Sequence, residues 1–303
     1  MNTAQILIDG LLAGAVIGLG AVGVTLTYSI LRFANFAQGE LVTAGAYAAL
    51  AAASALHALL PASAVTIGAL SFGWDLIAAT LAAMAATATL AIGLDWLLFR
   101  RLGEKASSIT IVMASFGASL ALRALLEFLC TSHPRYFSRD LQIAWRLPGG
   151  MRVTPDQLAL ACFALGLMAG THLLLTRTQT GRAMRAVSEN PALARVAGVD
   201  VRAVVRLTWA LGGALAAGAG VMLGVLVQIR PGMGFDLLLP MFAAAILGGI
   251  GSVPGAMLGA LIVGLGEALT VALVGPQWRA GLAFAVLIAI LLLRPAGLFG
   301  QRA

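Results

Sequence analysis

The sequence has 303 residues, of which 60% are hydrophobic and only 10% are charged. Soluble domains average about 45–50% apolar and about 25% charged residues, so this composition excludes a soluble globular protein and predicts a polytopic membrane protein. The formal net charge of +7 lies in loops beside apolar segments, which is typical of the positive-inside rule and not of a nucleic-acid-binding surface.

Segments free of Asp, Glu, Lys and Arg predict the membrane spans, which need about 20 apolar residues each. They cover residues 10–31, 41–74, 76–94, 106–122, 157–176, 207–229, 237–266 and 280–293. Within 41–74, one span should end near Leu60, before Pro61. Residues 237–266 are interrupted by GGIGSVPG, so we expect two short helices that meet there. The prediction is an all-α polytopic integral membrane protein with eight or nine transmembrane helices, some short or broken, in a single transmembrane domain over 1–303.

A polar cluster follows the first predicted span. Its members are Asn35, Phe36, Gln38, Gly39 and Glu40. Such a cluster needs water or a polar partner, because a carboxylate in the middle of a bilayer is costly. One interpretation is a broken helix that lines a translocation path. The other is a short interfacial loop, with Glu40 near the N-terminus of the next helix, where its charge is favourable.

Basic residues between the spans predict the orientation of the chain. Arg100, Arg101 and Lys105 mark one cytoplasmic loop, and residues 177–206 form a second. The arginines of this second loop are Arg177, Arg182, Arg185, Arg195, Arg202 and Arg206, and Arg294 and Arg302 place the C-terminus on the same side. Span parity puts residues 130–156 on the opposite side, so we expect an ordered external loop there and an external N-terminus.

One ion pair is predicted within a span. Arg123 and Glu127 stand four residues apart, which is about one helical turn. A helix that begins at Ala106 would place Arg123 about 26 Å along its axis, near the outer interface. We therefore expect an interfacial ion pair and not a proton relay.

The segment 181–201, GRAMRAVSENPALARVAGVDV, is a basic island between apolar spans. Asn190 can cap a helix that starts at Pro191, and Gly198 can end it in a left-handed conformation. The alanines between them would keep this helix narrow enough to fit a groove of a soluble partner. An ordinary positive-inside loop would explain the arginines but not these start and stop signals. The candidate docking residues are Arg185, Glu189, Asn190, Pro191, Ala192, Ala194, Arg195 and Gly198.

The interrupted segment near residue 250 is rich in glycine. Its candidate functional residues are Gly248, Gly249, Gly251, Ser252 and Pro254. Glycines permit a tight bend and close contact between helices. Two interpretations stay open for this break: a gate or lining of the translocation path, and helix packing alone.

Few side chains suggest catalysis or metal binding. His57, His133 and His172 are scattered, and none lies beside an acidic residue at helical spacing. The only lysine, Lys105, is followed by Ala106, whereas a phosphate-binding P-loop needs Gly-Lys-Ser/Thr. Cys130 and Cys162 have no CxxC spacing. We therefore expect neither an enzyme nor a metal site, and any nucleotide that drives this protein must bind another chain.

Four stretches together resemble permeases of branched-chain amino acid ABC transporters. They are NFAQGELVTAGAY at 35–47, GRAMRAVSENPALARVAGVDV at 181–201, LGGIGSVPGAMLGALIVGLGEAL at 247–269 and LLLRPAGLFG at 291–300. They lie in the family's order and bracket nearly the whole chain. Their order and the chain's length fit the LivH-type subunit better than its longer LivM-type partner.

The resemblance implies a multi-pass subunit of an importer in the lipid bilayer of the bacterial inner membrane. Its partners would be a second permease, two cytoplasmic ATPases and an external substrate-binding protein, with ATP bound by partner subunits and no cofactor in this chain. Residues 177–206 would be the cytoplasmic coupling loop. The general permease loop, Glu-Ala-Ala, three residues, then Gly, puts Ala192 in the glutamate slot when counted back from Gly198, so the nearest acidic residue is Glu189.

The resemblance also limits the chemical classes of solute that this chain is expected to transport. Branched-chain or other amino acids are expected, but the family includes importers of urea, short amides and aromatic acids. An ion-coupled secondary transporter is a further alternative, which the shortage of acidic groups inside the spans disfavours.

Overall fold

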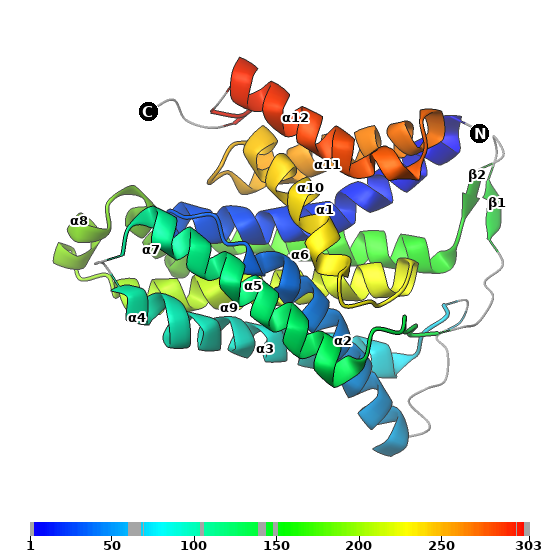
Figure 1. The fold of residues 1–303 in the computed structure, drawn as a ribbon, viewed down its shortest axis with the longest axis horizontal. Coiled ribbons are helices and arrows are strands. Elements are labelled where there is room, and N and C mark those ends of the chain that lie inside the picture. The colour runs from blue at the N-terminus through cyan, green and yellow to red at the C-terminus, as the bar shows by residue number, and fades with distance from the viewer. Residues whose placement is uncertain are drawn as a thin grey trace.

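The structure, a computed structural model, describes residues 3–59, 68, 70–103, 106–138, 144–147, 151–294 and 296–299. Most of these residues are helical (Figure 1). The α-helices are α1 (Thr3–Leu31), α2 (Ala37–Leu59), α3 (Trp74–Leu94), α4 (Arg100–Leu102), α5 (Ser108–Cys130), α6 (Pro155–Arg177), α7 (Gln179–Glu189), α8 (Pro191–Val196), α9 (Val201–Leu226), α10 (Met233–Gly248), α11 (Val253–Leu273) and α12 (Arg279–Leu293). A π-helical stretch, Asp95–Phe99, joins α3 to α4, and a 3₁₀ turn, Pro276–Trp278, precedes α12.

The described ranges contain eight helices that are long and apolar enough to cross a membrane, and α10 is a shorter apolar helix of 16 residues. The prediction of an all-α polytopic membrane protein with eight or nine spans, some short or broken, is confirmed. The predicted break near residue 250 is also confirmed, although α11 after it has 21 residues and is not short. The predicted end of the second span near Leu60 lies outside the described residues.

Helices α1 and α9 form the centre of the bundle, and 67% of the most apolar stretch of each is buried. Small residues let their neighbours approach closely: a Cβ added to Gly264 of α11 would lie 2.3 Å from the backbone nitrogen of Gly14 in α1. On the other side, a Cβ added to Gly220 of α9 would lie 2.1 Å from the carbonyl oxygen of Val42 in α2. Backbone contact of this kind holds helices together in lipid, where apolar burial between helices gains little.

Helices α2 and α10 begin inside the bundle and not at one of its ends (Figure 1). A Cβ added to Gly23 of α1 would lie 2.5 Å from Nε2 of Gln38 in the first turn of α2. Gly23 precedes the end of α1 at Leu31 by eight residues, or about 12 Å. The two helix starts also meet each other, since a Cβ added to Gly39 would lie 2.6 Å from the carbonyl oxygen of Gly234.

The predicted external loop, 130–156, contains an antiparallel ribbon that the sequence analysis did not predict. Strands β1 (Trp145–Leu147) and β2 (Met151–Val153) pair with Trp145 opposite Val153. Earlier in the loop, Arg135 and Ile229 exchange backbone hydrogen bonds of 2.9 and 2.8 Å. This loop therefore covers the segment between α9 and α10.

The long helices connect two ends of the molecule (Figure 1). The ribbon end holds β1, β2 and the start of α1, and the α8 end holds α4, α7 and α8. Helices α1, α6 and α12 all run from the ribbon end toward the α8 end. The two arginine-rich segments that the sequence assigns to one side of the membrane thus share one end, and the predicted external loop lies at the other.

Candidate functional site

Helix α7 leaves α6 through a tight turn at the α8 end. The Thr178 side chain caps it by accepting a hydrogen bond of 3.1 Å from the backbone N–H of Gly181. A Cβ added to Gly181 would lie 2.1 Å from the carbonyl oxygen of Leu175, so a larger residue would force the turn open. Met184 and Val187 are buried against the bundle, which fixes α7 by one apolar face.

Two arginines tie α7 to its neighbours through backbone carbonyls. Nη1 of Arg185 donates a hydrogen bond of 2.5 Å to the carbonyl oxygen of Leu175 in α6. Nη2 of Arg32 donates to the carbonyl oxygen of Ser188 in the last turn of α7. Because Arg32 directly follows α1, this contact links α7 to the segment that leads into α2.

Helix α8 has the predicted start and stop signals. Oδ1 of Asn190 accepts hydrogen bonds of 3.0 Å from the backbone N–H groups of Ala192 and Leu193, and Pro191 is the first helical residue. Gly198 has a φ angle of +83°, in the left-handed region that favours glycine. The prediction of a short helix between an Asn-Pro start and a glycine stop is confirmed.

The two faces of α8 differ in a way that the sequence analysis missed. Ala194 is only 4% exposed and packs into the hydrophobic core, so its small side chain fits α8 to the bundle. Leu193 and Val196 point outward, with 66% and 86% of their surface exposed. Their spacing of three residues was visible in the sequence and places them on one face. Ala192 and Arg195 are exposed as well.

The Gly-rich break brings α10 and α11 into backbone contact. A Cβ added to Gly248 would lie 2.1 Å from the carbonyl oxygen of Gly255, and Gly249 and Gly251 have φ angles of +98° and +94°. The backbone N–H groups of Leu298 and Phe299 donate to the carbonyl oxygens of Leu247 and Gly248, over 2.8 and 3.1 Å. Gly248 therefore serves packing, and the C-terminal segment is fastened to this break.

A cavity of about 570 Å³ opens at the α8 end. Its wall includes Arg185 and Glu189 of α7 together with Gly251, Ser252 and Pro254 of the Gly-rich break. The structure thus brings part of the predicted docking segment next to part of the predicted path. None of the residues from Asn35 to Glu40 is among the described residues that line this cavity.

The Asn35–Glu40 cluster lies within the bundle. Asn35 is 2% exposed, and Gln38 and Glu40 are fully buried. Oδ1 of Asn35 accepts a hydrogen bond of 3.1 Å from the backbone N–H of Ala37, and Nε2 of Gln38 donates one of 3.0 Å to the carbonyl oxygen of Gly212 in α9. This burial favours a helix that begins inside the bundle, and Glu40 lies in the first turn of α2, as the second interpretation expected.

Phe36 connects this cluster to two further helices. Its ring packs edge to face on Phe116 of α5, with centroids 5.9 Å apart, and lies 5.4 Å from the ring of Phe242 in α10. Its backbone N–H donates a hydrogen bond of 3.2 Å to the hydroxyl of Ser115. The segment between α1 and α2 is therefore held by side chains from α5 and α10, and the first turn of α2 is held by a backbone carbonyl of α9.

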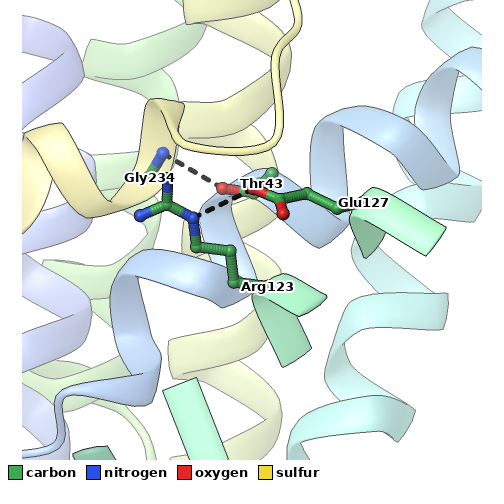
Figure 2. A network of polar contacts seen from close by, with 4 residues as sticks. All are labelled: Thr43, Arg123, Glu127 and Gly234. Carbon is green, nitrogen blue, oxygen red and sulfur yellow. Dashed lines mark hydrogen bonds and ion pairs between the residues drawn. The ribbon is translucent and has the colours of Figure 1, made fainter. Parts of the chain in front are cut away.

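A polar network lies where α2, α5 and α10 meet (Figure 2). The hydroxyl of Thr43 accepts a hydrogen bond of 3.0 Å from the backbone N–H of Gly234, at the start of α10. Nε of Arg123 is 3.2 Å from Oε1 of Glu127, which confirms the predicted ion pair. A Cβ added to Gly232 would lie 3.3 Å from Nη2 of Arg123, so the guanidinium lies beside the first turn of α10.

These features define a polytopic membrane protein: a helix bundle with two helices that start in its interior and a short helix with an exposed apolar face at one end. Residues 6–291 match the family described as branched-chain amino acid transport system / permease component. The chain therefore belongs to this family.

Individual relatives agree along nearly the whole chain. It is 32% identical to the high-affinity branched-chain amino acid transport system permease protein BraD of Pseudomonas aeruginosa, over 98% of this chain and 95% of the relative. It is 30% identical, with the same coverage, to the corresponding permease protein LivH of Escherichia coli K12. The probable permease protein LivH of Methanocaldococcus jannaschii is 28% identical over 92% of this chain and 87% of its own length.

Proposed function

We propose that this chain imports α-amino acids with branched apolar side chains, as one of two membrane-spanning subunits of an ABC importer. The observation that carries the proposal is the exposed pair on α8, Leu193 and Val196, on a helix whose other face is packed into the bundle. Such a helix presents an apolar surface to a soluble partner. The relatives are named as branched-chain amino acid permeases, which supports the substrate class.

ATP would be bound by partner subunits. The only lysine of the chain is followed by alanine, so a P-loop cannot form here. Two cytoplasmic ATPases would bind at the α8 end. Their closure would move α7, and Arg185 and Arg32 would pass this movement to α6 and to the segment after α1. The chain itself would carry out no catalysis, and its contribution would be a path and a docking helix.

A second permease of the LivM type would cover the face formed by α5. Only 17% of the most apolar stretch of α5 is buried, yet this helix carries Arg123 and Glu127 with exposed side-chain fractions of 38% and 43%. Charges at such positions are unfavourable against lipid and favourable beside water or protein. An external binding protein would deliver the solute at the ribbon end.

In the bacterial inner membrane, the α8 end would face the cytoplasm, with the N-terminus outside and the C-terminus inside. The arginines of 177–206 support this orientation through the positive-inside rule. Cysteines at two exposed positions test it: Ala186→Cys on α7 and Ser132→Cys in the loop after α5. The native cysteines, Cys130 and Cys162, are first replaced by serine.

In intact cells, an impermeant maleimide should label Ser132→Cys and spare Ala186→Cys until the membrane is opened. The opened cells serve as the control for reactivity, because both positions should then react. Labelling of Ala186→Cys alone in intact cells would reverse the proposed orientation.

The substrate class is tested by uptake in cells that depend on this chain. Labelled leucine uptake should fall when the gene is deleted and return with the intact gene. Unlabelled isoleucine and valine should compete, whereas urea, acetamide and phenylacetate should not. If urea or acetamide competes and isoleucine has no effect, the substrate is a small amide and the proposed amino acid class is wrong.

A further inference from the structure

A buried carboxylate lies next to the point where α2 and α10 begin. Glu40 is fully buried in the first turn of α2. Thr43, one turn further on, is close enough to interact with it, but neither carboxylate oxygen forms a hydrogen bond of normal geometry with the described residues. A buried acid without full partners is costly and marks a place where a ligand can supply the missing contacts.

Charged groups on α5 and α10 lie close enough to Glu40 to act on it electrostatically, at the junction where Gly234 contacts Gly39 and Gly232 lies beside Arg123. Arg123 is the positive one, and Glu127 and Asp236 are negative. The ion pair with Glu127 uses Nε of Arg123, which leaves the two Nη groups of the guanidinium for another acceptor. The Arg123 guanidinium also lies over the ring of Phe235, 5.7 Å from its centroid, so its position beside α10 is held by packing.

The start of α10 adds a second feature that favours an anion. Gly232, which precedes this helix, offers no side-chain cap, and Thr43 already accepts from the N–H of Gly234, so the partial positive charge of the helix N-terminus is what favours an anion here. Asp236 in this first turn is already paired with Arg230 over 2.5 Å. Glu40 thus offers an acceptor for a cation, and the Nη groups of Arg123, which lie beside the start of α10, offer donors for an anion.

We propose that Glu40 and Arg123 form a transient binding site for the ammonium and carboxylate groups of a zwitterionic α-amino acid on its way through the permease. This inference rests on the proposed function and adds how the path selects an amino acid over an uncharged solute. Arg123 and Glu127 are partly exposed, so the site opens toward α5. Glu40 is buried, and it is reached when α5 moves away from α2, the helix that it packs against.

Leucine analogues that lack one charge test the site on the purified permease–ATPase complex without the external binding protein. The probes are leucine, 4-methylpentanoate, which lacks the ammonium group, and 3-methylbutylamine, which lacks the carboxylate. Their dissociation constants are measured by saturation-transfer difference NMR, which detects weak binding. The intact complex should bind leucine roughly tenfold more tightly than either analogue, because each charged contact adds at least that factor.

Two variants test separately the binding of the ammonium group and of the carboxylate group. Glu40→Gln should remove the preference for leucine over 4-methylpentanoate, and Glu40→Asp should restore part of it. Arg123→Gln should instead remove the preference for leucine over 3-methylbutylamine. Because Arg123 is more exposed than Glu40, this variant still tests the site if Glu40→Gln folds poorly. Asp9→Asn, which neutralises an exposed acid on α1 outside this junction, is the control and should leave both preferences within about twofold.

Unchanged preferences in both Glu40→Gln and Arg123→Gln would overturn the site, as would the absence of any preference in the intact complex. ATP-driven leucine uptake by the same intact preparation keeps this result apart from the proposed function. Uptake with unchanged preferences rejects only the site, whereas a complex that transports no amino acid at all rejects the proposed function.

Discussion

A chain in which Leu193 and Val196 are both replaced by aspartate should insert and fold normally but lose its hold on the ATPase subunits. Both side chains are mostly exposed on α8, so the change should disturb little of the packing within the described bundle. Burial of two such side chains in a partner contributes about 1.5–3 kcal/mol each. We therefore expect binding to the ATPases to weaken at least 100-fold, with uptake lost.

Two further variants serve as controls for this result. Leu193→Ile with Val196→Ile keeps the apolar surface and should retain most ATPase binding. Arg195→Gln removes a positive charge from the same helix and should have a small effect, because exposed charges contribute little to binding energy. Affinity is measured by titration of purified ATPase onto the immobilised permease. Full binding by the aspartate variant and lost binding by Arg195→Gln would show that the segment acts through charge alone.

Gly234→Ala should strongly destabilise the bundle, although it adds only one methyl group. A Cβ at this position would lie 1.8 Å from the carbonyl oxygen of Gly39 and 2.5 Å from the hydroxyl of Thr43. Overpacking of a buried contact costs about 1–3 kcal/mol and occasionally more. We expect a fall in Tm of roughly 5–10 °C, or a chain that fails to accumulate, together with loss of uptake.

Gly166→Ala on α6 is the matched control, because a Cβ added there has no atom within 4 Å among its potential neighbours. Its Tm should stay within about 2 °C of the parent, since alanine also favours the helix. The Tm of each variant is measured by heating the purified chain and recording the temperature at which half of it is lost from the monodisperse peak in size-exclusion chromatography. Equal Tm values for the two variants would mean that the starts of α2 and α10 do not touch as described.

The sequence alone predicted the spans well, because apolar length is the dominant requirement in a bilayer. It also predicted the local signals of α8, since Asn190, Pro191 and Gly198 act through their own backbone. It did not predict where helices cross. Whether Gly23 meets Gln38 and Gly39 meets Gly234 depends on contacts between segments far apart in sequence, and no local pattern encodes them.

In the candidate site too, the sequence predicted local features but not the contacts between distant segments. The sequence identified Glu40 as a costly carboxylate but left open whether it lay at an interface or inside the bundle. The ion pair of Arg123 and Glu127 was predicted from spacing, yet its position beside the start of α10 was not. The sequence predicted that the small Ala194 would help α8 to fit a partner's groove, but Ala194 is buried and fits α8 to the bundle instead.

The most direct test of the account is leucine uptake into proteoliposomes that contain this chain with its second permease and ATPases, with the binding protein outside. Labelled leucine should accumulate only when ATP is present inside, at the α8 end, and should not depend on a sodium or proton gradient. A non-hydrolysable ATP analogue should give no uptake. Accumulation by this chain alone, driven by an ion gradient without ATP, would contradict the account and identify a secondary transporter.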